Sequence, residues 1–229
     1  MSVKFEKMIS PLLMFFFLAT FFFNSYPLEG HQMEDHQRYT ADRYNVYSSD
    51  EKKFVWIRVF KVASSTLFHY LKKDVSDLVQ SRPKRLPNKF NHYYKFSFVR
   101  NPWDRVVSCY FNKVVTKKAP DFKECFDKDF DFFVDFINHL DVARTNSHLK
   151  LQTKLIPVDQ LDFIGKMDNF AHDLNYVCEV IGINCGEIPH KHKTEHAHYS
   201  FYYTPRTREI IAEKYQEDIE TFGFTFETE

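Results

Sequence analysis

Residues 54–71 read F-V-W-I-R-V-F-K-V-A-S-S-T-L-F-H-Y-L, and the fold follows from this stretch. Its first half is apolar, β-branched and aromatic apart from one arginine, which predicts a strand buried in a sheet. Its second half has helical spacing, with Leu67, Tyr70 and Leu71 recurring along one face. The stretch therefore predicts a strand and a helix that are joined by a short turn over residues 61–66.

This turn carries one lysine, Lys61, and three hydroxyl side chains. A turn that opens a helix offers unpaired backbone N–H groups and the positive end of the helix dipole. With the lysine added, these groups make a site for a phosphate or a similar oxyanion. The alternative is that Ser64 or Ser65 caps the helix and Lys61 is solvated, since helix caps are commoner than anion sites.

A second stretch of the same design follows at residues 95–110, which read K-F-S-F-V-R-N-P-W-D-R-V-V-S-C-Y. Its apolar residues predict a short strand, and Asn101 and Pro102 suit the N-cap and the first position of a helix. Arg100 then lies at the carboxyl end of the strand, where ligands bind in open α/β sheets. Ser108 lies about two turns into the helix. Two such units, each with a cation at its turn, predict an α/β protein whose ligand has two phosphates.

The motifs K-V-A-S-S-T at 61–66 and F-V-R-N-P-W-D-R-V-V-S-C-Y at 98–110 together resemble the two cofactor signatures of sulfotransferases. More narrowly, they resemble the carbohydrate sulfotransferase group, which includes Golgi chondroitin and heparan enzymes and many microbial relatives. The stretches at 161–170 and 198–224 agree with this resemblance, which extends over residues 54–226 of the sequence.

The resemblance implies a three-layer α/β fold like that of P-loop NTPases, with a central, mainly parallel sheet and flanking helices. It also implies 3′-phosphoadenylyl sulfate (PAPS) as the sulfuryl donor, PAP as the product, and no metal. The residues that it assigns to the 5′-phosphosulfate are Lys61, Val62, Ala63, Ser64, Ser65 and Thr66. It assigns the 3′-phosphate to Arg100 and Ser108, and a lid over the cofactor to Lys193 and Thr194. Phe60 is a departure, because the family usually has proline before the lysine.

The acceptor implied by the resemblance is a hydroxyl of a carbohydrate. Residues 146–152 resemble a family segment His-x-x-Pro-Gln, with Leu151 in place of the proline. His148 and Gln152 share one face if the segment is helical. His148 is the best candidate for the general base, because a histidine near its working pKa suits proton removal. The alternatives are a structural role for His148 and His92 as the base.

The chain has 229 residues, which suits one domain with a sizeable core. Its 31 Lys and Arg balance its 31 Asp and Glu, so no net field favours nucleic acid as a partner. Residues 53–229 are expected to form the catalytic domain, and the polar residues 29–52 a stem or linker. Residues 1–28 are expected to be a signal anchor or transmembrane segment, since Lys4 and Lys7 precede an uncharged apolar run.

Such an anchor predicts a single-pass type II protein whose N-terminus is cytoplasmic and whose catalytic domain is lumenal. Residence in the Golgi membrane fits both the resemblance and the short apolar run at 9–23, which suits a thin bilayer. The alternatives are a cleaved signal peptide and a microbial protein that is either membrane-anchored or cytoplasmic.

Two further patterns leave alternatives open. A disulfide between Cys178 and Cys185 suits a lumen, and two thiols in the core are the alternative. The histidine-rich run at 189–199 suggests a metal site, but the resemblance places the cofactor lid there, so that no metal is predicted.

Two other functions compete with sulfuryl transfer. One is a non-catalytic member of the same fold that binds PAP or an acidic glycan. The other is a P-loop kinase, which is less favoured because the motif G-x-x-x-x-G-K-[ST] is absent and the turn contains no glycine.

Overall fold

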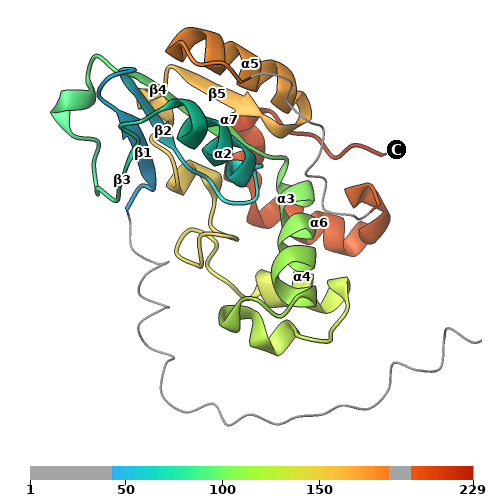
Figure 1. Ribbon diagram of the computed structural model, residues 1–229. Coiled ribbons are helices and arrows are strands. Elements are labelled where there is room, and N and C mark those ends of the chain that lie inside the picture. Colours follow the sequence, from blue (N-terminus) through green and yellow to red (C-terminus); the bar gives the residue numbers. More distant parts are fainter. Residues whose placement is uncertain (1–42, 186–196, 229) are drawn as a thin grey trace, which may run out of the picture. The chain divides into compact units, whose positions relative to one another are not determined.

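The computed structural model describes residues 43–185 and 197–228, which form a five-stranded sheet with helices packed against it (Figure 1). The strands, in the spatial order β3-β1-β2-β4-β5, are β1 Val46–Ser49, β2 Phe54–Ile57, β3 Val79–Ser81, β4 Tyr94–Val99 and β5 Phe163–Lys166. Strands β2, β4 and β5 are parallel neighbours, whereas β1 is antiparallel to both β2 and β3. All strands but β1 therefore point the same way, which confirms the mainly parallel sheet.

The helices of the described chain are α2 Ser64–Asp74, α3 Pro102–Cys109, α4 Phe130–Asn138, α5 Phe170–Ile181, α6 Pro205–Lys214 and α7 Gln216–Phe222. A π-helical segment, η3 Tyr110–Val115, continues α3, and a 3-10 segment, η4 Pro120–Cys125, precedes α4. The strand–turn–helix unit at 54–71 thus forms as predicted, with β2 leading into α2.

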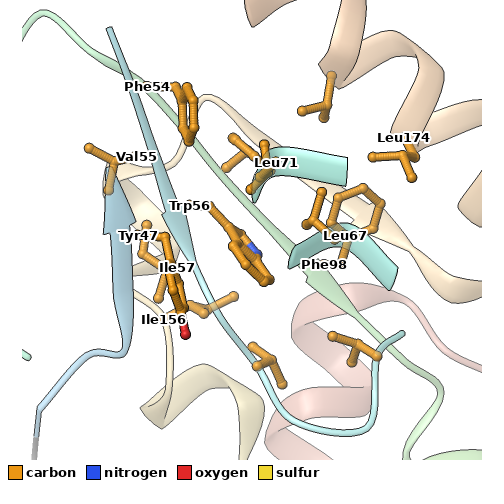
Figure 2. Close-up of a cluster of buried hydrophobic side chains, with 14 of the residues drawn as sticks. Tyr47, Phe54, Val55, Trp56, Ile57, Leu67, Leu71, Phe98, Ile156 and Leu174 are labelled. Atoms are coloured by element: carbon orange, nitrogen blue, oxygen red, sulfur yellow. The ribbon is translucent and has the colours of Figure 1, made fainter. Parts of the chain in front are cut away.

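One face of the sheet packs against α2 and α5. Trp56 in β2 stacks on Tyr47 in β1 with 5.0 Å between the ring centroids, and Tyr47 also contacts Phe68 of α2. Phe98 in β4 contacts Phe170 at the start of α5. Figure 2 shows Trp56 and Phe98 in one cluster of buried side chains with Leu67 of α2.

Helices α3, α4 and α6 share a second hydrophobic core beside the sheet (Figure 1). Its buried members include Trp103, Val107, Phe133, Ile137 and Ile211. The start of α3 follows the sequence prediction: the side chain of Asn101 accepts the backbone N–H of Trp103 at 3.2 Å, and Pro102 is the first helical residue.

The predicted stem at 29–52 requires a correction, because β1 lies inside it. All four residues of β1 are buried, and the strand pairs with both β2 and β3. Its two serines made the segment look like a polar linker, but the Ser49 hydroxyl donates to Asp77 at 2.6 Å. The folded domain therefore includes β1, and the predicted anchor at 1–28 lies outside the described residues.

No helix among the described residues is both long enough and apolar enough to cross a membrane.

A disulfide joins Cys178 in α5 to Cys185 just beyond it. Of the two alternatives for this pair, the structure has the disulfide. The other two cysteines, Cys109 and Cys125, are buried free thiols.

We predict that Gly165→Ala destabilises the sheet. Gly165 pairs with Phe98, and a Cβ at this glycine would lie within 3.0 Å of three ring atoms of Phe98. That ring is 1% exposed and contacts Phe170, so it has little room to move. Overpacking of this kind costs about 1–3 kcal/mol of unfolding free energy, which chemical denaturation would measure.

Phe98→Leu provides the control, because a smaller side chain makes room for the added methyl group. The double variant should lose less stability than the two single variants lose in sum. Strict additivity would contradict a clash between these two positions.

Candidate active site

The two motifs predicted to bind an anion meet at one edge of the sheet. Lys61 follows β2 and Arg100 follows β4, and because these strands are parallel neighbours, their carboxyl ends lie together. One guanidinium nitrogen of Arg100, Nη1, donates to the backbone carbonyl of Lys61 at 3.0 Å. The two cationic turns therefore form a single corner.

The turn at 61–66 has an unusual backbone. Lys61 and Ala63 have φ angles of 71° and 50°, in the left-handed region that residues with a side chain rarely adopt. Such strain is concentrated at ligand-binding sites.

The start of α2 has no side-chain cap. Ala63 occupies the N-cap position, so the alternative in which Ser64 or Ser65 caps the helix is wrong. The N–H groups of Thr66 and Leu67 donate to the Ala63 carbonyl, at 2.9 and 3.2 Å. Those of Ser64 and Ser65 have no acceptor within the described chain, nor has the buried hydroxyl of Thr66. Unpaired donors at a helix N-terminus are what an oxyanion requires.

Lys61 is partly buried and forms no ion pair with any described residue. Burial lowers the pKa of its ammonium group to about 8. The positive charges of Arg100, Lys113 and Arg105 contribute to this lowering of the pKa. Positive charge thus accumulates at the corner without a matching carboxylate at Lys61, which favours the binding of an anion.

Arg100 is held rigidly from two sides. Its guanidinium makes a two-pronged ion pair with Asp104, at 2.6 Å from Nε and 2.7 Å from Nη2. The side-chain amide of Gln152 exchanges two hydrogen bonds with the Arg100 backbone, both at 2.9 Å. Asp104 and the Lys61 carbonyl take three of the five N–H donors of the guanidinium. The other two N–H groups of the guanidinium have no acceptor within the described chain and remain for a ligand.

Gln152 is positioned in turn by Asp218 of α7, which is fully buried. The Asp218 carboxylate accepts the backbone N–H groups of Gln152 and Thr153 at 2.8 and 3.0 Å. Burial raises the pKa of this carboxyl, and Arg105 opposes that rise. A residue near the C-terminus therefore supports the backbone at Arg100 through one intermediate side chain.

Arg105 is a site residue that sequence reasoning missed. It is 2% exposed, and its guanidinium donates to three backbone carbonyls: Phe60 at 3.3 Å, Lys150 at 2.8 Å and Ser147 at 3.0 Å. It thereby ties α3 both to the anion-binding turn and to the segment that carries His148. The only signal was a second arginine five residues after Arg100 in R-N-P-W-D-R.

The remaining residues assigned to the donor are placed as follows. Ser108 is 2% exposed and lies in the last turn of α3. Lys193 and Thr194, assigned to the lid, lie outside the described residues.

His148 lies in a turn rather than in a helix, so the condition for a helix face shared with Gln152 is not met. Gln152 binds the backbone at Arg100, whereas the His148 ring packs on Phe60 with 4.8 Å between the ring centroids. Phe60 is the residue at which the turn departs from the family pattern. It brings the imidazole against the anion-binding turn.

The pKa of His148 was expected to lie near neutrality, but it lies well below. Burial, together with the neighbouring cations Lys113 and Lys61, lowers it to about 3. The ring is therefore neutral at physiological pH and is a weak base while the corner carries uncompensated positive charge.

His92, the alternative base, is exposed and lies before β4 begins. The cationic corner is at the other end of that strand. Six strand residues separate the two ends by roughly 20 Å, so His92 is wrong as a candidate for the same site.

A mainly parallel sheet with two cationic turns at its carboxyl edge defines a class of α/β proteins that hold nucleotide phosphates at this place. The chain belongs to the sulfotransferase family, whose sequence model matches residues 44–225. Membership of this family implies an enzyme. The match begins two residues before β1, which agrees with the position of that strand inside the domain.

Two curated proteins are similar to the chain. A carbohydrate sulfotransferase 14 of Danio rerio is 28% identical over 155 residues, which are 56% of this chain and 42% of that protein. A carbohydrate sulfotransferase 14 of Mus musculus is 43% identical over 65 residues, which are 25% of this chain and 17% of that protein. The matches thus span less than half the length of these relatives. No solved structure gave a significant match.

We predict that PAP binds more weakly as the pH rises through about 8, where Lys61 loses its proton. The protonated lysine attracts the anion and the neutral one does not, so affinity is highest below this pKa. Between pH 7 and pH 9 the dissociation constant should rise roughly tenfold, which isothermal titration calorimetry would measure.

Lys61→Arg is the matched control, because a guanidinium stays charged throughout this range. The titration of the ligand is common to both proteins. If the dissociation constant of PAP rose equally with pH in the unmodified protein and in Lys61→Arg, Lys61 would not be the group that titrates.

Proposed function

We propose that this protein transfers a sulfuryl group from PAPS to a hydroxyl of a carbohydrate. The observation that carries this proposal is Lys61, which is partly buried and has no ion pair with a described residue, on a strained turn that is hydrogen-bonded to Arg100. Membership of the sulfotransferase family supports the reaction class.

The donor contacts follow from the two turns. Lys61 and the N–H groups and hydroxyls of residues 62–66 would bind the 5′-phosphosulfate, and Arg100 and Ser108 the 3′-phosphate. This assignment is supported by donors that have no acceptor among the described residues: the amides of Ser64 and Ser65, the hydroxyl of Thr66 and two N–H groups of Arg100. Lys193 and Thr194 are proposed to cover the bound donor.

In the proposed reaction, the acceptor oxygen forms a bond to sulfur while the bond between sulfur and the 5′-phosphate oxygen breaks. PAP leaves with the electron pair of that bond, and the acceptor proton passes to the imidazole of His148. Negative charge grows on the leaving phosphate oxygen as the bond breaks. Lys61 and the turn amides stabilise this charge, as preorganised donors do in phosphoryl transfer.

The low basicity of His148 is linked to the same charges. Burial is the main cause of its low pKa, and Lys61, one of the cations that add to it, is also proposed to bind the anionic donor. Donor binding should therefore raise the pKa of the ring and strengthen the base at the stage when a proton must be removed.

We further propose that the acceptor is a glycan and that the enzyme works in the Golgi lumen, anchored as a type II protein by residues 1–28. The names of the two relatives support the carbohydrate acceptor. The disulfide between Cys178 and Cys185 supports an oxidising compartment, since such bonds persist there and are rare in the cytosol.

A second candidate is a non-catalytic protein that binds PAP or an acidic glycan. The pKa of about 3 at His148 favours it, because so weak a base removes a hydroxyl proton slowly. Such a protein would be stabilised against heat by PAP and would yield no sulfated product.

We predict that Lys61→Ala lowers turnover at saturating PAPS at least about 100-fold, or roughly 3 kcal/mol of transition-state stabilisation. The reason is that no other described cation lies on the turn at 61–66. Transfer of radiolabelled sulfate from PAPS to a panel of glycans, by the full chain, would measure this.

Lys118→Ala is the control, since Lys118 is exposed. It should leave turnover unchanged. Turnover close to that of the unmodified protein in Lys61→Ala would remove this lysine from the mechanism, and PAP binding without product in the unmodified protein would favour the second candidate.

A further inference from the structure

Three side chains beside the cationic corner form a chain of hydrogen bonds. His148 and Asn146 are each 8% exposed, and Asp121 lies on η4. Asn146 Oδ1 accepts the backbone N–H of His148 at 2.9 Å and lies 2.7 Å from His148 Nδ1. The amide nitrogen of Asn146 donates to Asp121 Oδ2. The chain thus runs from a carboxylate through an amide to an imidazole.

The orientation of the Asn146 amide is determined by its two outer partners. A backbone N–H can only donate, so the amide atom that faces His148 must be the oxygen. An ionised carboxylate can only accept, so the atom that faces Asp121 must be the nitrogen. Both contacts require the same orientation, and a flipped amide would break both.

This orientation also determines the tautomer of His148. The amide oxygen has no proton to give, so the short contact to His148 Nδ1 requires that this nitrogen carry the hydrogen. In a neutral imidazole the basic lone pair then lies on Nε2. The backbone around the ring is held as well, because Arg105 donates to the Ser147 carbonyl at 3.0 Å.

We propose that Asn146, backed by Asp121, is a positioning residue that holds His148 in the Nδ1–H tautomer and so makes Nε2 the atom that receives the acceptor proton. This inference rests on the proposed sulfuryl transfer. Such a residue orients a catalytic histidine through a hydrogen bond to the ring nitrogen that does not take part in the proton transfer. Here a neutral amide, that of Asn146, contacts both the ring and the Asp121 carboxylate.

The charged groups around His148 influence its pKa. Cations approach from several elements: Lys113 on η3, Lys61 on the turn, Arg105 on α3 and Arg58 after β2. Asp121 on η4 is the acidic group of the relay. Replacing Asn146 by aspartate would place a carboxylate against the ring, which should raise the pKa of His148 and shift the acidic limb of the rate profile to higher pH.

The direct test is nuclear magnetic resonance of the full chain labelled with ¹⁵N-histidine, with His148→Gln used to assign the signal. We expect His148 in the Nδ1–H form in the unmodified protein, and the Nε2–H form to appear in Asn146→Ala. Sulfate transfer by Asn146→Ala should fall about 10- to 100-fold in kcat. The KM for PAPS should stay unchanged, because Asn146 is not assigned to the donor.

Glu124→Ala is the matched control, because Glu124 is an exposed acid on the same η4 segment as Asp121. It should change neither the tautomer nor kcat. If Asn146→Ala does not fold, Asp121→Ala tests the outer hydrogen bond of the relay. Its expected share of the Nε2–H form is smaller, because the backbone N–H of His148 still holds the amide oxygen of Asn146 toward the ring.

An Nε2–H signal for His148 in the unmodified protein would overturn the relay whatever the activity is. The same holds if KM for PAPS rises in Asn146→Ala while kcat stays constant. If the tautomer is as expected but the unmodified protein transfers no sulfate, the proposed function fails while the relay stands as a structural feature.

Discussion

The parallel pairing of β2 with β4 is the constraint on which the site depends. It brings the ends of two strands to one edge, so that the turn after each strand opens at the same place. The hydrogen bond from Arg100 to the Lys61 carbonyl then joins the turns into one corner. Without this pairing, each motif would be an isolated basic turn with no reason to bind one ligand at both ends.

The cationic side chains of the corner outnumber the carboxylates that pair with them. Asp104 pairs with Arg100, but Lys61 has no carboxylate within the described chain, and Arg105 is buried against backbone carbonyls alone. Left-handed backbone at Lys61 and Ala63 adds strain. An anion would relieve the repulsion among these cations, and Lys61 and Arg105 are also among the charges that lower the pKa of His148.

The features that were predicted correctly from the sequence depend on residues that are close together in the chain. The cap at Asn101, the proline after it and the apolar strand before it are decided within a few residues, and the structure has them as expected. β1 was missed because a strand that is buried throughout shows no alternation, and its serines gave it a polar composition. The role of Arg105 was missed because its three carbonyl partners are distant in sequence.

The sequence by itself determined which turns carry cations, where the main strands and helices begin, and which family the chain belongs to, because these depend on neighbouring residues. Only the tertiary structure decided that His148 is buried beside Phe60, that its pKa is low, and that Asn146 contacts both its ring and Asp121. The physical reason is that burial, repulsion between charges and the partner of a ring nitrogen are set by groups that meet only when the chain folds.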